Sequence, residues 1–284
     1  KPLRPPGRQY FGVRLTPGQQ FGGTLETLES SATSIPLAGN IIVNGKRTSI
    51  LDFNKTIYNR ALGAIGEKFE GKEIGQKGVA EVRDKLNSAY EAIKPKLSWK
   101  ATPEYDMAVR QIEKTDLARL QKPLQDKARA VYETLVSERM AQGGKMDGET
   151  FKQVEGELGA IARRYLGAKD HPELQDFGEI IAKVQGLMRD QLERVNPQYA
   201  EKLSNINEGW AILTRLENAA ARRVGSNSVF TPTDFSAAVR AGDTSVRKGG
   251  FARGEAFMQD ISGPAQEVLP GTIPDSGSAG RIAT

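Results

Sequence analysis

Residues 172–222 read PELQDFGEIIAKVQGLMRDQLERVNPQYAEKLSNINEGWAILTRLENAAAR, and this stretch decides the fold class. Apolar residues recur at three- and four-residue steps on both sides of Asn196-Pro197, as they do on the buried face of an amphipathic helix. They are Leu174, Phe177, Ile181, Val184, Met188, Leu192 and Val195 in the first half, and Tyr199, Leu203, Ile206, Trp210, Leu213, Leu216 and Ala220 in the second. Because the connection is short, we predict two long neighbouring helices, a helical hairpin.

Threonine followed by proline predicts three further helix starts, because the hydroxyl caps the first turn and proline fits the first helical position. These pairs are Thr16-Pro17, Thr102-Pro103 and Thr231-Pro232. Apolar residues at helical spacing predict more helices over about 50–65, 79–93, 124–136 and 147–167, with Ser49 and Asp147 as caps. No segment alternates apolar and polar residues over a sustained length, so we predict no strand.

Glycine-rich segments separate the predicted helices. The glycines between residues 66 and 78 predict a loop, and Asn44-Gly45 favours a turn within the ambiguous segment 37–47, LAGNIIVNGKR. A phosphate-binding loop is excluded there by spacing, because five residues separate Gly39 from Gly45 where that loop has four. In addition, Arg47 occupies the position of the Ser or Thr that binds magnesium.

These patterns predict an all-α fold, an elongated bundle of helical hairpins with an extended basic N-terminal arm and a Pro/Gly/Ser-rich C-terminal tail. Gly143-Gly144 is the expected subdomain boundary. The predicted parts are an extended arm (1–15), an N-terminal helical region (16–143), a C-terminal helical region (144–268) that holds the long hairpin 172–222, and a flexible tail (269–284).

The composition excludes several kinds of site. Hydrophobic residues make up 38% of the 284 residues and charged residues 26%, which is the balance of a folded protein. The chain has no cysteine and one histidine, His171, which excludes thiolate zinc sites, multi-histidine metal sites and most hydrolase triads. His171 precedes Pro172 at a helix start, where a surface or capping role is expected. We therefore predict no catalytic residue, no metal site and no cofactor.

No apolar run approaches the length of about 18 residues that a membrane-spanning helix needs. The chain starts with Lys1 and stops after Thr284, so it is expected to be the visible or processed part of something longer.

The N-terminal arm concentrates positive charge. Residues 1–53 carry six Lys or Arg against three Asp or Glu, and no acid precedes Glu26. Arg4, Arg8 and Arg14 are therefore candidates for contact with phosphate, with an acidic partner surface or with anionic lipid. A solvated tail is the alternative.

The segment from Thr231 to Ile261 is predicted to form two short helices around a basic, glycine-rich turn. The turn supplies docking or phosphate-contacting candidates, because glycine lets the backbone approach a partner closely. These candidates are Arg247, Lys248, Gly249, Gly250 and Arg253. The glycine pair is equally consistent with a simple joint between helices. Contact with DNA would be independent of sequence and sensitive to salt, because no base-reading motif is present.

An enzymatic alternative is a fragment that cleaves peptidoglycan. Glu29-Ser30 and Gly186-Leu187-Met188 resemble two short motifs of lytic transglycosylases, which lie close together in that family and far apart here. The helical spacing explains Met188 as a core residue instead.

Longer phrases carry a second resemblance. NPQYAEKLSNINEGWA (196–211), the segment 229–262 and IPDSGSAGR (273–281) resemble internal virion or DNA-ejection proteins of short-tailed bacteriophages and prophages. LTPGQ (15–19) and ILDFNKTIYNRALGAIG (50–66) are similar to the upstream half of the same proteins.

This resemblance implies a non-enzymatic structural protein of the virion interior, packaged near the portal and delivered to the host envelope during genome ejection. It implies a homo-oligomeric ring or tube, with the portal or further ejection proteins as partners and possible contacts to DNA and to the host envelope. Related chains continue beyond the Pro-Asp-Ser-Gly stretch into an apolar segment rich in glycine and alanine. The alternative class is a sequence-independent DNA-binding structural protein.

Overall fold

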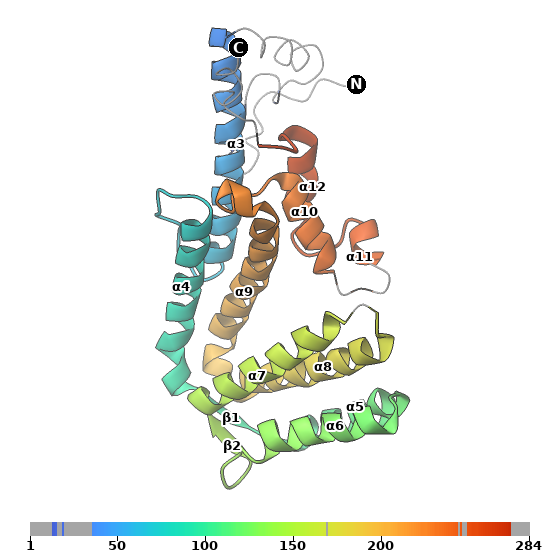
Figure 1. Ribbon diagram of the computed structural model, residues 1–284. Helices are drawn as coiled ribbons and strands as arrows, with labels where there is room; N and C mark the ends of the chain where they lie inside the picture. Colours follow the sequence, from blue (N-terminus) through green and yellow to red (C-terminus); the bar gives the residue numbers. More distant parts are fainter. Residues whose placement is uncertain are drawn as a thin grey trace. The chain divides into compact units, whose positions relative to one another are not determined.

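A computed structural model describes residues 13–15, 19, 36–168, 170–243, 245 and 249–273 (Figure 1). Most of these residues are helical, which confirms the helical class predicted from the sequence. The chain divides into two compact units, each described by itself below. Unit 1 combines the described residues up to Asn87 with those from Asn205 onward, and unit 2 is the continuous stretch Ser88–Ser204. Unit 2 is therefore inserted, in sequence, into unit 1.

Unit 1 is built from helices of both ends of the chain. These are α3 (Pro36–Gly63), most of α4 (Gln76–Ile93), most of α9 (Ala200–Ala220), the 3-10 segment η5 (Ala221–Ser226), α10 (Pro232–Ala241), α11 (Gly249–Ala252) and α12 (Gln259–Val268). α4 and α9 each cross the boundary, so both connections between the units are helical.

Three phenylalanines lie at the centre of unit 1. Phe53 of α3 meets Phe230 and Phe235 edge-on, with ring centroids 6.1 and 5.9 Å away, and all three are fully buried. Aromatic pairs in this geometry add to the stability from burial alone. α9 packs closely against α4, because a Cβ on Gly209 would lie 2.5 Å from the Leu86 side chain.

Asn54 joins α3 to a segment 176 residues later in the chain. Its side-chain amide donates to the carbonyls of Ile50 (2.8 Å) and Phe230 (2.7 Å), and its Oδ1 accepts from the Phe230 amide (3.2 Å). Both residues are fully buried, so the carboxamide takes the place of water or a strand partner for the Phe230 backbone.

The start of α3 corrects two predictions. The helix begins at Pro36 and runs through Asn44-Gly45, so the turn expected there is wrong, and Ser49 is an interior residue instead of a cap. Ser49 is fully buried, and its hydroxyl bonds to the carbonyls of Gly45 and Arg14 and to Gln19 Oε1. These distant partners offset the cost of about 1 kcal/mol that a glycine brings to a helix interior. The helix predicted from Thr16 to Ser34 lies almost wholly outside the described residues.

Unit 2 is built around the α7–α8 pair. Its elements are the end of α4, η1 (Lys94–Lys96), β1 (Ser98–Lys100), α5 (Pro103–Thr115), η2 (Leu117–Arg119), α6 (Lys122–Tyr132), the π-helical segment η3 (Glu133–Ser137), β2 (Lys145–Asp147), α7 (Gly148–Leu166), α8 (Pro172–Val195), η4 (Pro197–Tyr199) and the start of α9. The predicted caps are confirmed at Thr102, which accepts from the Tyr105 amide, and at Asp147, which accepts from the Thr150 amide.

Glycine lets α7 and α8 approach each other closely. A Cβ on Gly178 of α8 would lie 2.8 Å from the Leu166 amide nitrogen and 3.1 Å from the Ala162 carbonyl oxygen of α7. Only hydrogen fits in this space, because Cβ contacts under 3.0 Å do not occur in folded proteins.

The prediction that the chain has no strand is wrong, because β1 and β2 pair antiparallel with Trp99 opposite Met146. Three residues are too few to show alternation, and tertiary contacts hold the pair in place. Trp99 is fully buried and donates from Nε1 to the Met188 carbonyl (3.0 Å). Asn196, at the end of α8, binds both backbone groups of Ser98 in the way that Asn54 binds Phe230.

The expected parts of the chain and the observed units have different boundaries. Gly143 and Gly144, with φ of 83° and 67°, form a turn inside unit 2 instead of a subdomain boundary. The predicted helices of the 172–222 segment are present as α8 and α9, joined at Asn196. α8 belongs to unit 2 and most of α9 to unit 1, because the division depends on contacts that are distant in sequence.

Candidate functional site

The candidate docking segment follows α10 in unit 1. Thr231 starts α10 with a capping box: its hydroxyl accepts from the Asp234 amide and the Asp234 carboxylate accepts from the Thr231 amide, as the Thr-Pro start predicts. Arg223 donates from Nε to the same carboxylate (2.7 Å). Burial favours the neutral form of Asp234, but the bonds from Arg223 and Thr231 outweigh it and lower the pKa of Asp234. The docking segment therefore follows a helix, α10, whose first turn is fixed by these bonds.

Gly249 and Gly250 are the first two residues of α11, so the predicted glycine turn is wrong at these positions. The buried carboxylate of Asp243 accepts from the amides of Ser245 (2.9 Å) and Phe251 (2.8 Å), and Ser245 Oγ accepts from the Gly250 amide (2.7 Å). A Cβ on Gly250 would lie 3.2 Å from both the Asp243 and the Ser245 oxygen atoms. Gly250 thus permits the close approach expected of a glycine, but its partner is the protein's own Asp243.

Arginines and phenylalanines pair around α11. The Arg240 guanidinium lies 5.8 Å from the ring centroid of Phe251, and that of Arg215 lies 4.8 Å from the ring centroid of Phe257. Phe257 is 40% exposed. We call Arg215, Arg240, Phe251, Arg253 and Phe257 the arginine–aromatic cluster.

The cluster offers charge and apolar surface together. Arg215 also donates to the carbonyls of Ala211 (2.9 Å) and Gly242 (3.2 Å), which fixes it across the end of α10. Burial lowers the pKa of Arg215 and Asp243 opposes this effect, but a guanidinium stays charged in proteins. Arg253 is exposed and pairs with Glu255 (2.8 Å). Such a combination binds phosphate or carboxylate groups and stacks on planar groups.

Of the basic candidates in the N-terminal arm, Arg14 alone lies among the described residues. It forms a bidentate pair with Asp52 of α3, with Nε–Oδ2 and Nη2–Oδ1 distances of 2.7 and 2.9 Å. Burial raises the pKa of Asp52, but the hydrogen bonds from Arg14 lower it by more, so the pKa is lowered overall. Arg14 is thus bound to α3.

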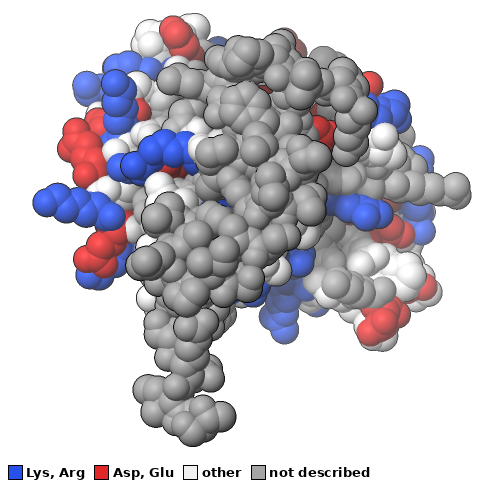
Figure 2. Space-filling model, turned by 90° about the horizontal axis from the view of Figure 1, so that it is seen from above, with Lys and Arg blue, Asp and Glu red and all other residues white. Residues whose placement is uncertain are grey.

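Four basic candidates, Arg4, Arg8, Arg247 and Lys248, lie outside the described residues. On the described part of the face in Figure 2, Lys and Arg side chains alternate with Asp and Glu.

Unit 2 also contains a buried charged group that was not predicted from the sequence. Glu155 of α7 accepts from Gln185 (2.6 Å) and Arg189 Nε (2.8 Å) of α8. Burial favours the neutral carboxyl, but Arg189 and Lys152 outweigh it, so the pKa of Glu155 is lowered. One signal was present: Glu155 follows Phe151 by four residues and so falls on the apolar face of the helix. The group joins the two helices of the central pair.

The described residues that were considered for an enzyme are explained by their positions in the fold. His171 stands at the N-cap position of α8 and its side chain makes no capping bond. Met188 is fully buried, which confirms it as a core residue. Glu29 and Ser30 lie outside the described residues.

Over residues 36–168, 170–243 and 249–273, His, Asp and Glu side chains form no group of three that suits a metal ion. In the same described part of the chain, no helix combines the length and the apolar character needed to cross a bilayer. No protein family, curated protein or solved structure matches this sequence.

Proposed function

We propose that this chain is a non-enzymatic structural protein of a bacteriophage virion, packaged inside the capsid near the portal and active in genome ejection across the host envelope. The proposal rests on the phrases that resemble internal virion proteins of short-tailed phages. The observation that carries it is where these phrases lie in the fold.

The resembling phrases contribute to one core. Segment 50–66 supplies Phe53, and segment 229–262 supplies Phe230 and Phe235, whose rings contact it. Segment 196–211 supplies Gly209, where the backbone of α9 approaches Leu86. Three of the resembling phrases thus lie wholly or partly in unit 1, which supports their belonging to one module. Of the resembling phrases, only residues 196–204 belong to unit 2.

The proposal also covers the arrangement of the helices and the way in which copies of the chain assemble. An elongated bundle of helical hairpins, with a basic arm at one end and a Pro/Gly/Ser-rich tail at the other, suits a ring or tube in which each copy contacts its neighbours. The arginine–aromatic cluster is the proposed docking surface, for a second copy, the portal or another ejection protein. After ejection the chain would contact the host envelope.

Mass spectrometry of purified virions, with stoichiometry, tests this function. We expect several copies per particle and a larger species in sedimentation. The double variant Gly249→Ala/Gly250→Ala should enter virions in reduced amount, because the Gly250 methyl would press on Asp243 and disturb α11. Gly263→Ala is the matched control, since its Cβ meets open space. A compact monomer in solution, together with absence from virions, would contradict the proposal.

A sequence-independent DNA-binding protein is the second candidate, favoured by the exposed arginines and Phe257 of the cluster. Filter binding across salt concentrations distinguishes it, because phosphate contacts weaken steeply as salt rises. Absence of DNA affinity at low salt removes this candidate. Zymography on peptidoglycan tests the remaining enzymatic alternative.

A further inference from the structure

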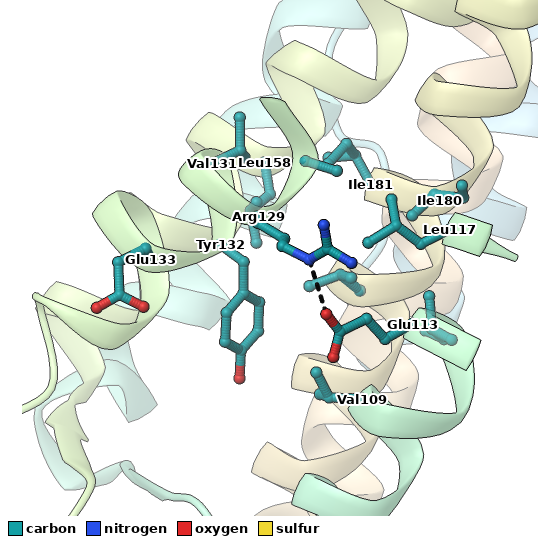
Figure 3. Close-up of a pocket in the computed structure, with 13 residues that line it drawn as sticks. Val109, Glu113, Leu117, Arg129, Val131, Tyr132, Glu133, Leu158, Ile180 and Ile181 are labelled. Carbon is teal, nitrogen blue, oxygen red and sulfur yellow. Dashed lines mark hydrogen bonds and ion pairs between the residues drawn. The ribbon is translucent and has the colours of Figure 1, made fainter. Parts of the chain in front are cut away.

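A pocket of about 280 Å³ opens in unit 2 between the α5–α6 layer and the α7–α8 pair (Figure 3). Nine of its thirteen lining residues are aliphatic. They are Val109, Ile112, Leu117, Ala128, Val131, Leu158, Ile180, Ile181 and Val184. A dry cavity of about 150 Å³ with such a lining already binds benzene in another protein. This pocket therefore has room for a larger apolar ring system.

The π-helical segment at the end of α6 shapes one wall of the pocket. The Glu138 amide bonds to the Glu133 carbonyl (2.9 Å), five residues back, so the last turn of the helix is widened. Leu135 and Val136, adjacent in sequence, are both buried by this turn. Tyr132, just before the segment, and Glu133, its first residue, line the pocket instead. Such widened turns are frequent at functional sites.

Charged groups lie at the mouth of the pocket and already have partners. Figure 3 shows Arg129 reaching from α6 toward Glu113 of α5, and the Arg129 Nε to Glu113 Oε1 distance is 2.8 Å. Arg129 also lies 3.4 Å from Asp126. Glu133 also lines the pocket, and Figure 3 shows its carboxylate pointing away from Arg129 and Glu113. Among the described lining residues Arg129 is the cation, and it is already paired with Glu113 and Asp126, so the mouth offers an incoming anion no unpaired positive charge.

We propose that this pocket is a binding site for a small, mainly apolar ligand that bears no negative charge. The aliphatic lining gains from burying a ring or a short hydrocarbon body. An anionic ligand meets Glu113 and finds Arg129 already paired, whereas a neutral or positively charged polar end is tolerated. All residues that line the site belong to unit 2 and lie outside the resembling phrases, so the site is independent of the proposed virion function.

Two dyes with the same ring system test the site on the full chain. N-phenyl-1-naphthylamine is uncharged and fluoresces more strongly in apolar surroundings, and 8-anilinonaphthalene-1-sulfonate adds a sulfonate. We expect saturable binding of the uncharged dye with one site per chain. The anionic dye should bind more weakly by about fivefold or more, because like charges oppose it. Glu113→Gln should narrow this difference, because it removes a carboxylate from the mouth and releases Arg129 from its ion pair.

Substitutions that fill the pocket separate it from other apolar surfaces. Val109→Phe and Ile112→Phe, tested singly, should weaken binding of the uncharged dye by about tenfold, since either ring occupies the ligand's space. Ala160→Phe is the matched control. It places the same ring, from α7, in a separate and more open hollow, lined by Lys127, Ala130 and Leu135 among others, and should change binding by less than about twofold.

Circular dichroism establishes that each variant is folded, and the two filling variants give independent readings if one is not. The proposal is overturned if the folded protein shows no saturable binding, if both filling variants bind like the original chain, or if the anionic dye binds more tightly. The proposal is also overturned if dye binding is lost when the chain self-associates, because a neighbouring copy of the chain would then occupy the pocket.

Discussion

Asn54→Ala removes the contact between α3 and Phe230 without changing the hydrophobic core around it. The substitution leaves the Phe230 amide and carbonyl unpaired in a fully buried position. Each such group costs about 1–3 kcal/mol, so the free energy of unfolding of unit 1 should fall by about 2–6 kcal/mol. A typical domain has only about 5–15 kcal/mol in total.

The two tryptophans allow each unit to be followed separately, because Trp99 lies in unit 2 and Trp210 in unit 1. In a Trp99→Phe background, urea unfolding monitored by fluorescence reports unit 1 through Trp210. Asn218→Ala is the control, since Asn218 is exposed on α9 and should change stability by no more than about 0.5 kcal/mol. Equal effects of the Asn54 and Asn218 substitutions would refute the reasoning. Asn196→Ala extends the test to unit 2, read through Trp99 in a Trp210→Phe background.

Two further predictions concern the α7–α8 pair. The pKa of Glu155 is lower in the fold than its usual value of 4.5, so its contribution to stability is complete above that value and is lost as pH falls toward the folded pKa. Glu155→Gln should reduce the loss of unfolding free energy at acid pH, measured by urea titrations at several pH values. Arg189→Met should destabilise unit 2 by about 1–3 kcal/mol, since it leaves the buried Glu155 carboxylate without the positive charge of Arg189. Gly178→Ala should destabilise unit 2 by about 1 kcal/mol or more despite the better helix propensity of alanine, whereas Gly186→Ala, where a Cβ meets open space, should stabilise it by about 0.5–1 kcal/mol. A thermal melt that shifts in the same direction for both glycine variants would contradict the packing argument.

Local chemistry made the helices predictable. A capping hydroxyl or carboxylate and a proline specify a helix start within four residues, so Thr102, Asp147, Pro172 and Thr231 were all placed correctly from the sequence. Ser49 has the same residue chemistry and is no cap. Its hydroxyl instead bonds to Arg14 and Gln19, and the sequence pattern does not show that these residues lie beside it.

Contacts distant in sequence were not predictable in the same way. β1 depends on Asn196 and Met188, about ninety to a hundred residues away, and the division into units depends on Asn54 meeting Phe230. The docking segment was found because its glycines and basic residues are consecutive. Arg215 and Phe257 were missed as members of the cluster because they come from different helices and meet only in the fold.

The insertion of unit 2 has a consequence for the nascent chain. During translation Asn54 emerges 176 residues before Phe230, which at about 5–20 residues per second is a wait of roughly 10–35 s. Unit 2 is continuous and is complete at Ser204, before the second half of unit 1 has been made. The apolar face of α3, including Phe53 and Ile57, therefore leaves the ribosome long before its partners in α9 and α10. We expect unit 2 to fold first on the ribosome, and α3 to be the segment that chaperones engage.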